Sequence, residues 1–283
     1  MTKLHSKYGP YALITGASSG IGAEFAHQLA GAGFDLILVA RRRQKLEVLA
    51  AELRTQFGIQ VHIVGLDLSQ TGAVDELVKQ IGGHDVGLVV NCAGVFTAGP
   101  FIRNDAKDEA DLVTLNVLVP MQLAHHFGRK LAQMQRGGII LVASTVGHQA
   151  APYLANYAAT KAYVATLGQA LSYELKGSGV AVQVLSPGPT HTEGVEEAAG
   201  IDFGALPLPM MAPKRVVAKS LKRLGRRALV VPGPANKVMD VMGKYLTPRP
   251  VLTRMFGFLL SRALDESPTT AANESAPDSV IGG

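Results

Sequence analysis

The chain has 283 residues and a formal net charge of +5, with 47% hydrophobic and 17% charged residues. This composition excludes a disordered polar chain and a collagen-like repeat, and the length suits one or two packed domains. The single cysteine, Cys92, excludes an intramolecular disulfide, and because no Cys/His cluster has zinc-ligand spacing we expect no metal site. No apolar run has the roughly 18 residues of a membrane span, and the first is too short for a signal peptide, so we expect a cytoplasmic protein.

Short apolar runs rich in β-branched residues alternate with segments of helical periodicity along most of the chain. The runs lie at residues 11–15, 36–40, 61–66, 86–90, 139–143, 180–185 and 228–231. Most are continuously apolar, which is typical of strands buried on both faces of a parallel sheet. Between them, stripes such as Ile21, Phe25 and Leu29 repeat at three- and four-residue steps. We therefore predict an α/β fold, a Rossmann-like doubly wound, seven-stranded parallel sheet flanked by helices on both faces.

We expect a single dinucleotide-binding and catalytic domain over residues 1–264. Residues 191–213 interrupt the strand and helix rhythm, and a loop of this length favours a substrate lid. Its apolar side chains would either contact an apolar substrate or pack the lid against the body; they are Phe203, Leu206, Leu208, Met210 and Met211. Residues 236–264 form a predicted helical extension, and the polar segment 265–283 is predicted to be a disordered tail.

An apolar stripe in the extension leaves three alternatives open. The stripe consists of Leu252, Met255, Phe256, Leu259, Leu260 and Leu264. Such a helix could dock on its own domain, form a subunit interface in a homodimer or homotetramer, or lie on a membrane surface through residues 252–264, the last being the least favoured. Residues 214–227 hold seven basic residues and no acid, but no aromatic residue is interleaved, so we expect a solvated face and no nucleic-acid partner.

A glycine-rich loop lies directly between the first predicted strand and the first predicted helix. Gly16 allows a sharp turn off the strand, Gly20 lets the backbone approach a pyrophosphate, and Gly22 permits close packing of helix on sheet. The free N–H groups at the start of the helix complete a site for an anion. The loop predicts dinucleotide binding by residues Gly16, Ser18, Ser19, Gly20, Ile21 and Gly22.

The end of the second predicted strand indicates which dinucleotide is bound. A site that prefers NAD places an acid there, but this strand ends in arginines, and Asp35 lies at its opposite end. The guanidinium groups of Arg41 and Arg42 would instead bind a 2′-phosphate in forked geometry. We therefore expect NADP(H) to be preferred over NAD(H).

A candidate catalytic set is formed by a tyrosine, a lysine and a serine. Tyr157 and Lys161 are four residues apart in a helical segment, so they share one face, and Ser144 follows the fifth predicted strand. A phenol has a pKa near 10, so it can donate a proton to a developing alkoxide at neutral pH, and an adjacent ammonium would stabilise its anion. A ligand across the carboxyl ends of the strands would meet all three side chains.

Together with the glycine loop, these residues resemble the short-chain dehydrogenase/reductase family over roughly residues 10–235. Further positions that carry the resemblance are Asn91, Ala93, Gly94, Asn116, Pro187 and Gly188. The resemblance implies carbonyl reduction or alcohol oxidation with Tyr157 as general acid or base. It implies that Ser144 orients the substrate carbonyl and that Lys161 binds the nicotinamide ribose and lowers the tyrosine pKa.

The resemblance also implies roles at less distinctive positions. Asn116 would hold a water that links Lys161 to solvent, and Asp67 and Leu68 would contact the adenine. Asn91, Ala93 and Gly94 would line the centre of the cofactor site. The nicotinamide carboxamide would be met by the backbone around Pro187, Gly188, Thr190 and Thr192. Cys92 replaces the usual second asparagine of this motif, and we expect it to pack as a small apolar residue.

The same residues leave other functions and partners open. A catalytically idle NADP(H) sensor or scaffold of the same fold is the main alternative, although a sensor has no need of a proton relay. His148 and His191 lie near the expected cleft, where they would either pack or contact substrate. We expect an apolar small-molecule substrate that carries a carbonyl or alcohol group, and the sequence does not indicate its identity.

Overall fold

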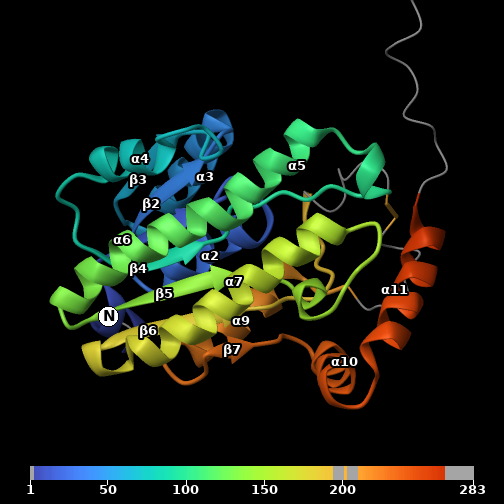
Figure 1. The fold of residues 1–283 in the computed structure, drawn as a ribbon. Helices are drawn as coiled ribbons and strands as arrows, with labels where there is room; N and C mark the ends of the chain where they lie inside the picture. The colour runs from blue at the N-terminus through green and yellow to red at the C-terminus, as the bar shows by residue number, and fades with distance from the viewer. Residues whose placement is uncertain (1–2, 194–200, 203–209, 265–283) are drawn as a thin grey trace, which may run out of the picture.

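The central element of the computed structural model, which describes residues 3–193, 201–202 and 210–264, is a parallel sheet. Its seven strands follow the order β3-β2-β1-β4-β5-β6-β7. They are β1 (Tyr11–Thr15), β2 (Asp35–Ala40), β3 (Val61–Gly65), β4 (Val86–Asn91), β5 (Gly137–Val142), β6 (Val180–Leu185) and β7 (Leu229–Val230). The predicted Rossmann-like α/β fold is confirmed, and every predicted strand is present (Figure 1).

Helices cover both faces of this sheet. The helices on one face are α2 (Gly20–Gly31), α3 (Arg43–Phe57) and α9 (Pro213–Arg223), and those on the other are α4 (Ala73–Ile81), α6 (Val119–Gln133) and α7 (Ala155–Glu174). Figure 1 shows α6 and α7 lying across the near side of the sheet. Neighbouring strand residues point into opposite layers, so Ile14 packs with the first group and Leu13 with the second. Burial of both faces explains the continuously apolar runs in the sequence.

The order of the strands reverses between β1 and β4. From β1 the chain builds outward through β2 and β3, then returns to place β4 on the other side of β1. The connections after β1 and β4 therefore diverge, which opens a crevice at their carboxyl ends. The Thr15 hydroxyl spans this point, because its Oγ1 accepts hydrogen bonds of 3.1 Å from the backbone N–H groups of Cys92 and Ala93.

The remaining helices lie at the ends of the sheet and in the connections. They are α1 (Lys3–Tyr8), η1 (Phe101–Arg103), α5 (Ala106–Val113), η2 (Thr114–Leu118), η3 (Thr145–His148), η4 (Lys176–Ser178), α10 (Pro234–Tyr245) and α11 (Arg249–Ala263). Element η2 is a π-helical turn between α5 and α6. No helix in the described ranges has the length and apolar character needed to cross a membrane.

The C-terminal helix docks on its own chain through one face. Leu260 and Ala263 are buried with Leu154 and Ile201, and the backbone N–H of Asp202 donates to the carbonyl oxygen of Ala263 at 2.7 Å. The opposite face carries the exposed side chains Val251, Met255 and Phe258. Docking on the same chain is thus confirmed for the buried side of α11. Met255 of the predicted stripe is 43% exposed, so it does not take part in this docking.

The structure describes only part of the predicted lid. Met211 pairs with Thr190 through an isolated parallel bridge and packs against the main core, so this side chain joins the lid to the body. Phe203, Leu206 and Leu208 lie outside the described residues, as does the segment 265–283. The basic residues 214–227 lie on α9 and the turn after it, where Val216 and Val217 are buried and most of the charged side chains are exposed.

Candidate active site

A cavity of about 650 Å³ lies at the carboxyl ends of the strands, where the strand order reverses. Its volume is within the range of ordinary ligand sites. It is lined by every predicted site residue except Asn91 and Asn116. The fold thus brings the glycine loop, the arginines after β2, the serine after β5 and the face of α7 to one cavity.

The glycine loop is packed too closely for side chains. Gly16 has a φ of +67°, and a Cβ there would lie 2.8 Å from the backbone of Ala93. A Cβ on Gly22 would lie 2.1 Å from the carbonyl oxygen of Gly16, which agrees with the close packing expected at this position. Gly20 has a φ of +56° and faces Thr192, whose Cγ2 would lie 2.9 Å from an added Cβ. The loop is therefore a backbone cradle at the start of α2, suited to a pyrophosphate.

The three candidate catalytic side chains converge at the other end of the cavity. Tyr157 and Lys161 lie on one face of α7, and the Lys161 Nζ is 5.6 Å from the centre of the Tyr157 ring. Lys161 donates a hydrogen bond of 3.1 Å to the carbonyl oxygen of Val142, the last residue of β5. Ser144 follows that strand and lines the same cavity as Tyr157, and its hydroxyl acts to lower the pKa of the Tyr157 phenol. The end of β5 therefore positions the lysine and the serine around one phenol.

Burial and the neighbouring Ser144 hydroxyl act in opposite directions on the pKa of the phenol. Burial raises the pKa of Tyr157 to about 12, and it outweighs the opposing effect of the Ser144 hydrogen bond. Burial also lowers the pKa of Lys161 to about 8. The lowering of the tyrosine pKa by Lys161 stays a prediction, and in this structure burial of the phenol is the largest influence on its pKa. At neutral pH the phenol is protonated and the ammonium remains largely charged.

Asn116 and Asn91 are the two predicted site residues that do not line the cavity. The Asn116 side chain lies in the π-helical turn η2, accepts from the N–H of Val95 at 3.0 Å, and donates to the Val95 carbonyl at 2.8 Å and to Thr160 Oγ1 at 3.2 Å. The Asn116 amide therefore already forms hydrogen bonds with other groups of the protein. Its expected role of holding a water stays a prediction. The Asn91 amide is buried at the end of β4 and has no hydrogen-bond partner among the described residues.

A buried carboxylate next to the catalytic helix was not found by sequence reasoning. Glu109 of α5 accepts hydrogen bonds from Thr97 at 2.8 Å, from Asn104 at 2.7 Å and from Asn156 at 2.6 Å. Burial alone would raise the pKa of Glu109, but these hydrogen bonds outweigh it and hold the pKa below its ordinary value. Asn156 directly precedes Tyr157, so Glu109 anchors the first turn of α7. In the sequence, the only local sign of Glu109 is an acid three residues before an apolar helical position. That pattern is too common to indicate a role for the residue.

The opposite end of the cavity is positively charged. Arg41 and Arg42 follow β2, and Asp67 and Leu68 follow β3. Burial would raise the pKa of Asp67, but hydrogen bonds from the backbone and hydroxyl of Ser69, together with the charge of Arg41, hold it below its ordinary value. Two guanidinium groups beside the glycine cradle fit a dinucleotide with a further phosphate on its ribose.

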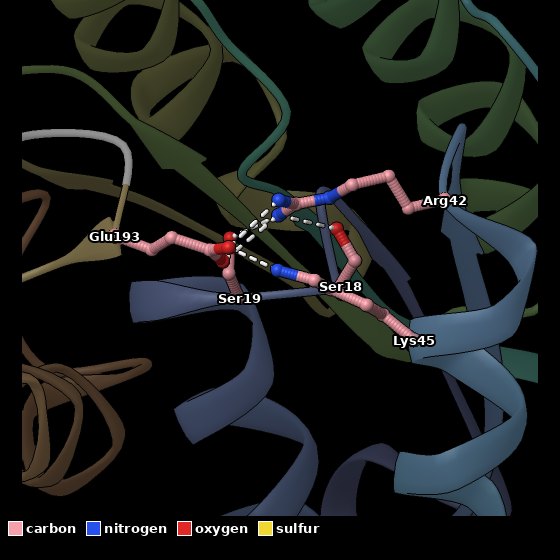
Figure 2. A network of polar contacts seen from close by, with 5 residues as sticks. All are labelled: Ser18, Ser19, Arg42, Lys45 and Glu193. Carbon is pink, nitrogen blue, oxygen red and sulfur yellow. Dashed lines mark hydrogen bonds and ion pairs between the residues drawn. The ribbon is translucent and has the colours of Figure 1, made fainter. Parts of the chain in front are cut away.

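Arg42 is engaged by a residue that the sequence analysis did not single out. Figure 2 shows the Glu193 carboxylate between Arg42 and Lys45, with Ser18 and Ser19 on the same guanidinium. Arg42 Nη1 is 2.9 Å from Oε1 of Glu193 and Nη2 is 3.1 Å from Oε2, which is a forked ion pair. No local pattern could have indicated this pair, because 151 residues separate its members.

The two candidate histidines do not line the cavity, whereas Cys92 does. His148 is 5% exposed and is held by Asp240 and Ser186, whereas His191 is exposed, and neither lines the cavity. Cys92 does line it and packs against the main core, as expected for a small apolar residue. Burial raises the pKa of the Cys92 thiol to about 12, so it is not a thiolate at neutral pH.

Comparison with known proteins gives consistent matches over this part of the chain. A family model described as short chain dehydrogenase matches residues 10–200. A 7beta-hydroxysteroid dehydrogenase from Collinsella aerofaciens is 30% identical over 236 residues, which cover 83% of this chain and 90% of that protein. A very-long-chain 3-oxoacyl-CoA reductase from Podospora anserina is 32% identical over 245 residues, covering 85% of this chain and 64% of that protein.

Solved structures agree with these matches. One from a study of 7beta-hydroxysteroid dehydrogenase stereoselectivity has a TM-score of 0.83 and 28% identity, covering 90% of this chain and 100% of that chain. A short-chain dehydrogenase from Sphingobium yanoikuyae in complex with NADPH has a TM-score of 0.76 and 32% identity, covering 95% of this chain and 100% of that chain.

Proposed function

This chain belongs to the short-chain dehydrogenase family and is an oxidoreductase acting on hydroxyl or carbonyl groups of small molecules, and we propose that it uses NADP(H) with Tyr157 as general acid and base. It would reduce a ketone or aldehyde, or oxidise the corresponding secondary alcohol. The observation that carries the proposal is the arrangement of Ser144 and Lys161 around one half-buried phenol that lines the cavity.

The side chains of this protein would perform the proton chemistry and the orientation of the substrate. When bound, NADPH supplies a hydride to the carbonyl carbon. Tyr157, which is protonated at neutral pH, donates its proton to the carbonyl oxygen, and Ser144 donates a hydrogen bond to the same oxygen. The charged ammonium of Lys161 stabilises the phenolate that remains. In the direction of oxidation, the same phenolate would accept the proton of the alcohol.

The preference for NADP(H) over NAD(H) rests on the arginines after β2. Arg41 and Arg42 line the adenosine end of the cavity, and the strand carries no carboxylate at that end to accept the ribose hydroxyls. The cofactor would lie with its pyrophosphate on the cradle of Gly16, Gly20 and Gly22. A similar protein, the enzyme from Sphingobium yanoikuyae, has been solved in complex with NADPH.

We expect the substrate to be a bulky, apolar carbonyl compound. The catalytic end of the cavity is lined by Phe96, Leu115, Val146 and Leu154 beside Tyr157. Similar proteins are named for hydroxysteroids and for very-long-chain 3-oxoacyl-CoA, and both of these substrates carry large apolar bodies. Assembly into a homodimer or homotetramer remains a proposal, for which the exposed apolar face of α11 offers a surface.

Replacement of the tyrosine tests the mechanism. We expect Tyr157→Phe to lower kcat by about 10²–10⁴-fold with a panel of steroid, acyl and aromatic ketones, while NADPH binds as in the wild type. Turnover is followed by the absorbance of the reduced nicotinamide. Tyr163→Phe is the matched control, because Tyr163 lies on the same helix and is 41% exposed. Full turnover by Tyr157→Phe would refute the mechanism, and tight NADPH binding without turnover of any carbonyl would favour a sensor.

A further inference from the structure

Glu193 forms ion pairs with Arg42, which lines the adenosine end of the cavity, and with Lys45 (Figure 2). The forked pair with Arg42 uses both carboxylate oxygens, and Lys45 contacts Oε1. Arg42 Nη2 also donates to the Ser19 hydroxyl at 2.9 Å and to that of Ser18 at 3.3 Å. The Arg42 guanidinium and the Glu193 carboxylate together therefore join α3, the glycine loop and the segment that follows Pro187.

The local charges are those of a site for an anion. Helix α3 begins at Arg43 with Arg42 as its N-cap, and its first turn contains Lys45 and no acid. Cations at the positive end of a helix dipole are unfavourable unless an anion lies nearby. The start of α2, immediately after Ser19, directs a second positive helix end toward the same corner. Glu193 supplies the counter-charge from a distant part of the chain.

We propose that Glu193 is an internal anion in the 2′-phosphate subsite, and that NADP(H) must displace it in order to bind. This inference rests on the proposed preference for NADP(H) and assigns a competitor to that site. A phosphate monoester carries a charge of about −1.5 to −2 and three acceptor oxygens, so it outcompetes a single carboxylate for the same guanidinium and ammonium. NAD(H) has no group that requires Arg42, so its binding leaves the pair intact. Glu193 thus lowers the affinity for NADP(H) and leaves the affinity for NAD(H) unchanged.

Displacement of the Glu193 side chain need not move the chain that precedes it. Thr190 is bridged to Met211, and the backbone N–H of His191 donates to the carbonyl oxygen of Met211 at 3.0 Å. These bonds anchor the chain two residues before Glu193, so Pro187 and Gly188 at the catalytic end need not move. Hydrogen bonds and charges of Lys45 and Arg42 hold the pKa of Glu193 at about 2, so the carboxylate is ionised throughout the physiological range. Protonation therefore does not relieve the competition near neutral pH.

Binding of cofactor fragments tests this competition without any turnover. We would measure Kd for 2′,5′-ADP and for 5′-AMP by calorimetry at low salt, with the wild type, Glu193→Gln and Glu47→Gln. Glu47 pairs with Arg43 at 3.0 Å, so its replacement removes the same charge from the same basic cluster without a contact to Arg42. We expect Glu193→Gln to bind 2′,5′-ADP about three- to tenfold more tightly, with 5′-AMP unchanged and Glu47→Gln within about twofold of wild type. Equal effects of the two variants, or weaker binding to Glu193→Gln, would overturn the proposal.

A third variant separates this inference from the cofactor preference. If the wild type prefers 2′,5′-ADP over 5′-AMP, Arg42→Gln should abolish that preference, and failure of Glu193→Gln alone would refute only the competition. If the wild type shows no preference but Glu193→Gln does, the cofactor preference is wrong and the competition is supported. If neither the wild type nor Glu193→Gln discriminates between the two fragments, both proposals are refuted.

Discussion

His148 and Asp240 form a buried pair although 92 residues separate them in the chain. The Nδ1 atom of His148 contacts Oδ1 of Asp240, and its Nε2 lies 3.2 Å from the hydroxyl oxygen of Ser186. The side chains are 5% and 8% exposed. Since η3 begins directly after Ser144, the pair ties the loop that carries the candidate serine to helix α10.

Loss of this pair should destabilise the fold. We expect Asp240→Ala to lower the free energy of unfolding by about 3 kcal/mol, because it removes the carboxylate that holds a buried imidazole. Urea denaturation at pH 7 measures the effect. Asp111→Ala is the control, because Asp111 pairs with Lys107 on the exposed surface of α5, and its loss should cost less than about 1 kcal/mol. Equal costs for the two variants would show that the buried pair contributes no more than a surface pair.

The buried ammonium of Lys161 should make stability depend on alkaline pH. Its pKa is about 8 in the folded protein and has an ordinary value of 10.5, so between these values the unfolded chain binds more protons and stability rises with pH. Lys161→Met removes this dependence. We expect the free energy of unfolding of the wild type to gain roughly 2–3 kcal/mol relative to the variant between pH 7 and pH 10.5. Parallel profiles for the two proteins would contradict the lowered pKa.

The glycine cradle should not tolerate a single methyl group. We expect Gly22→Ala to lower stability by about 1–3 kcal/mol and to weaken NADPH binding, because its Cβ would lie 2.1 Å from the Gly16 carbonyl oxygen and the loop would have to shift. Thermal unfolding with and without NADPH separates the two effects. Gly83→Ala is the control, since no atom lies within 4 Å of a Cβ at that position. Unchanged melting and binding in Gly22→Ala would show that the cradle adapts.

Local patterns in the sequence were enough to predict the fold and most of the cavity. Continuous apolar runs predicted buried parallel strands because burial on both faces leaves no alternation. The spacing of Tyr157 and Lys161 predicted a shared helical face because four residues are about one turn. Gly16 and Gly22 marked the loop because each position excludes a Cβ. In each case the physical constraint acts within a few residues, so it is visible in the order of the residues.

Contacts between distant segments, and the burial that they cause, came only from the tertiary structure. Glu193 meets Arg42 and Asp240 meets His148 because the strand order and the docking of α10 place them together. The net rise in the pKa of Tyr157 also came from the tertiary structure, because desolvation depends on how the layers close around the phenol. The linear order of residues therefore specified which chemical groups this protein carries. Packing decided the charge states and partners of these groups, because both depend on neighbours that are distant in the sequence.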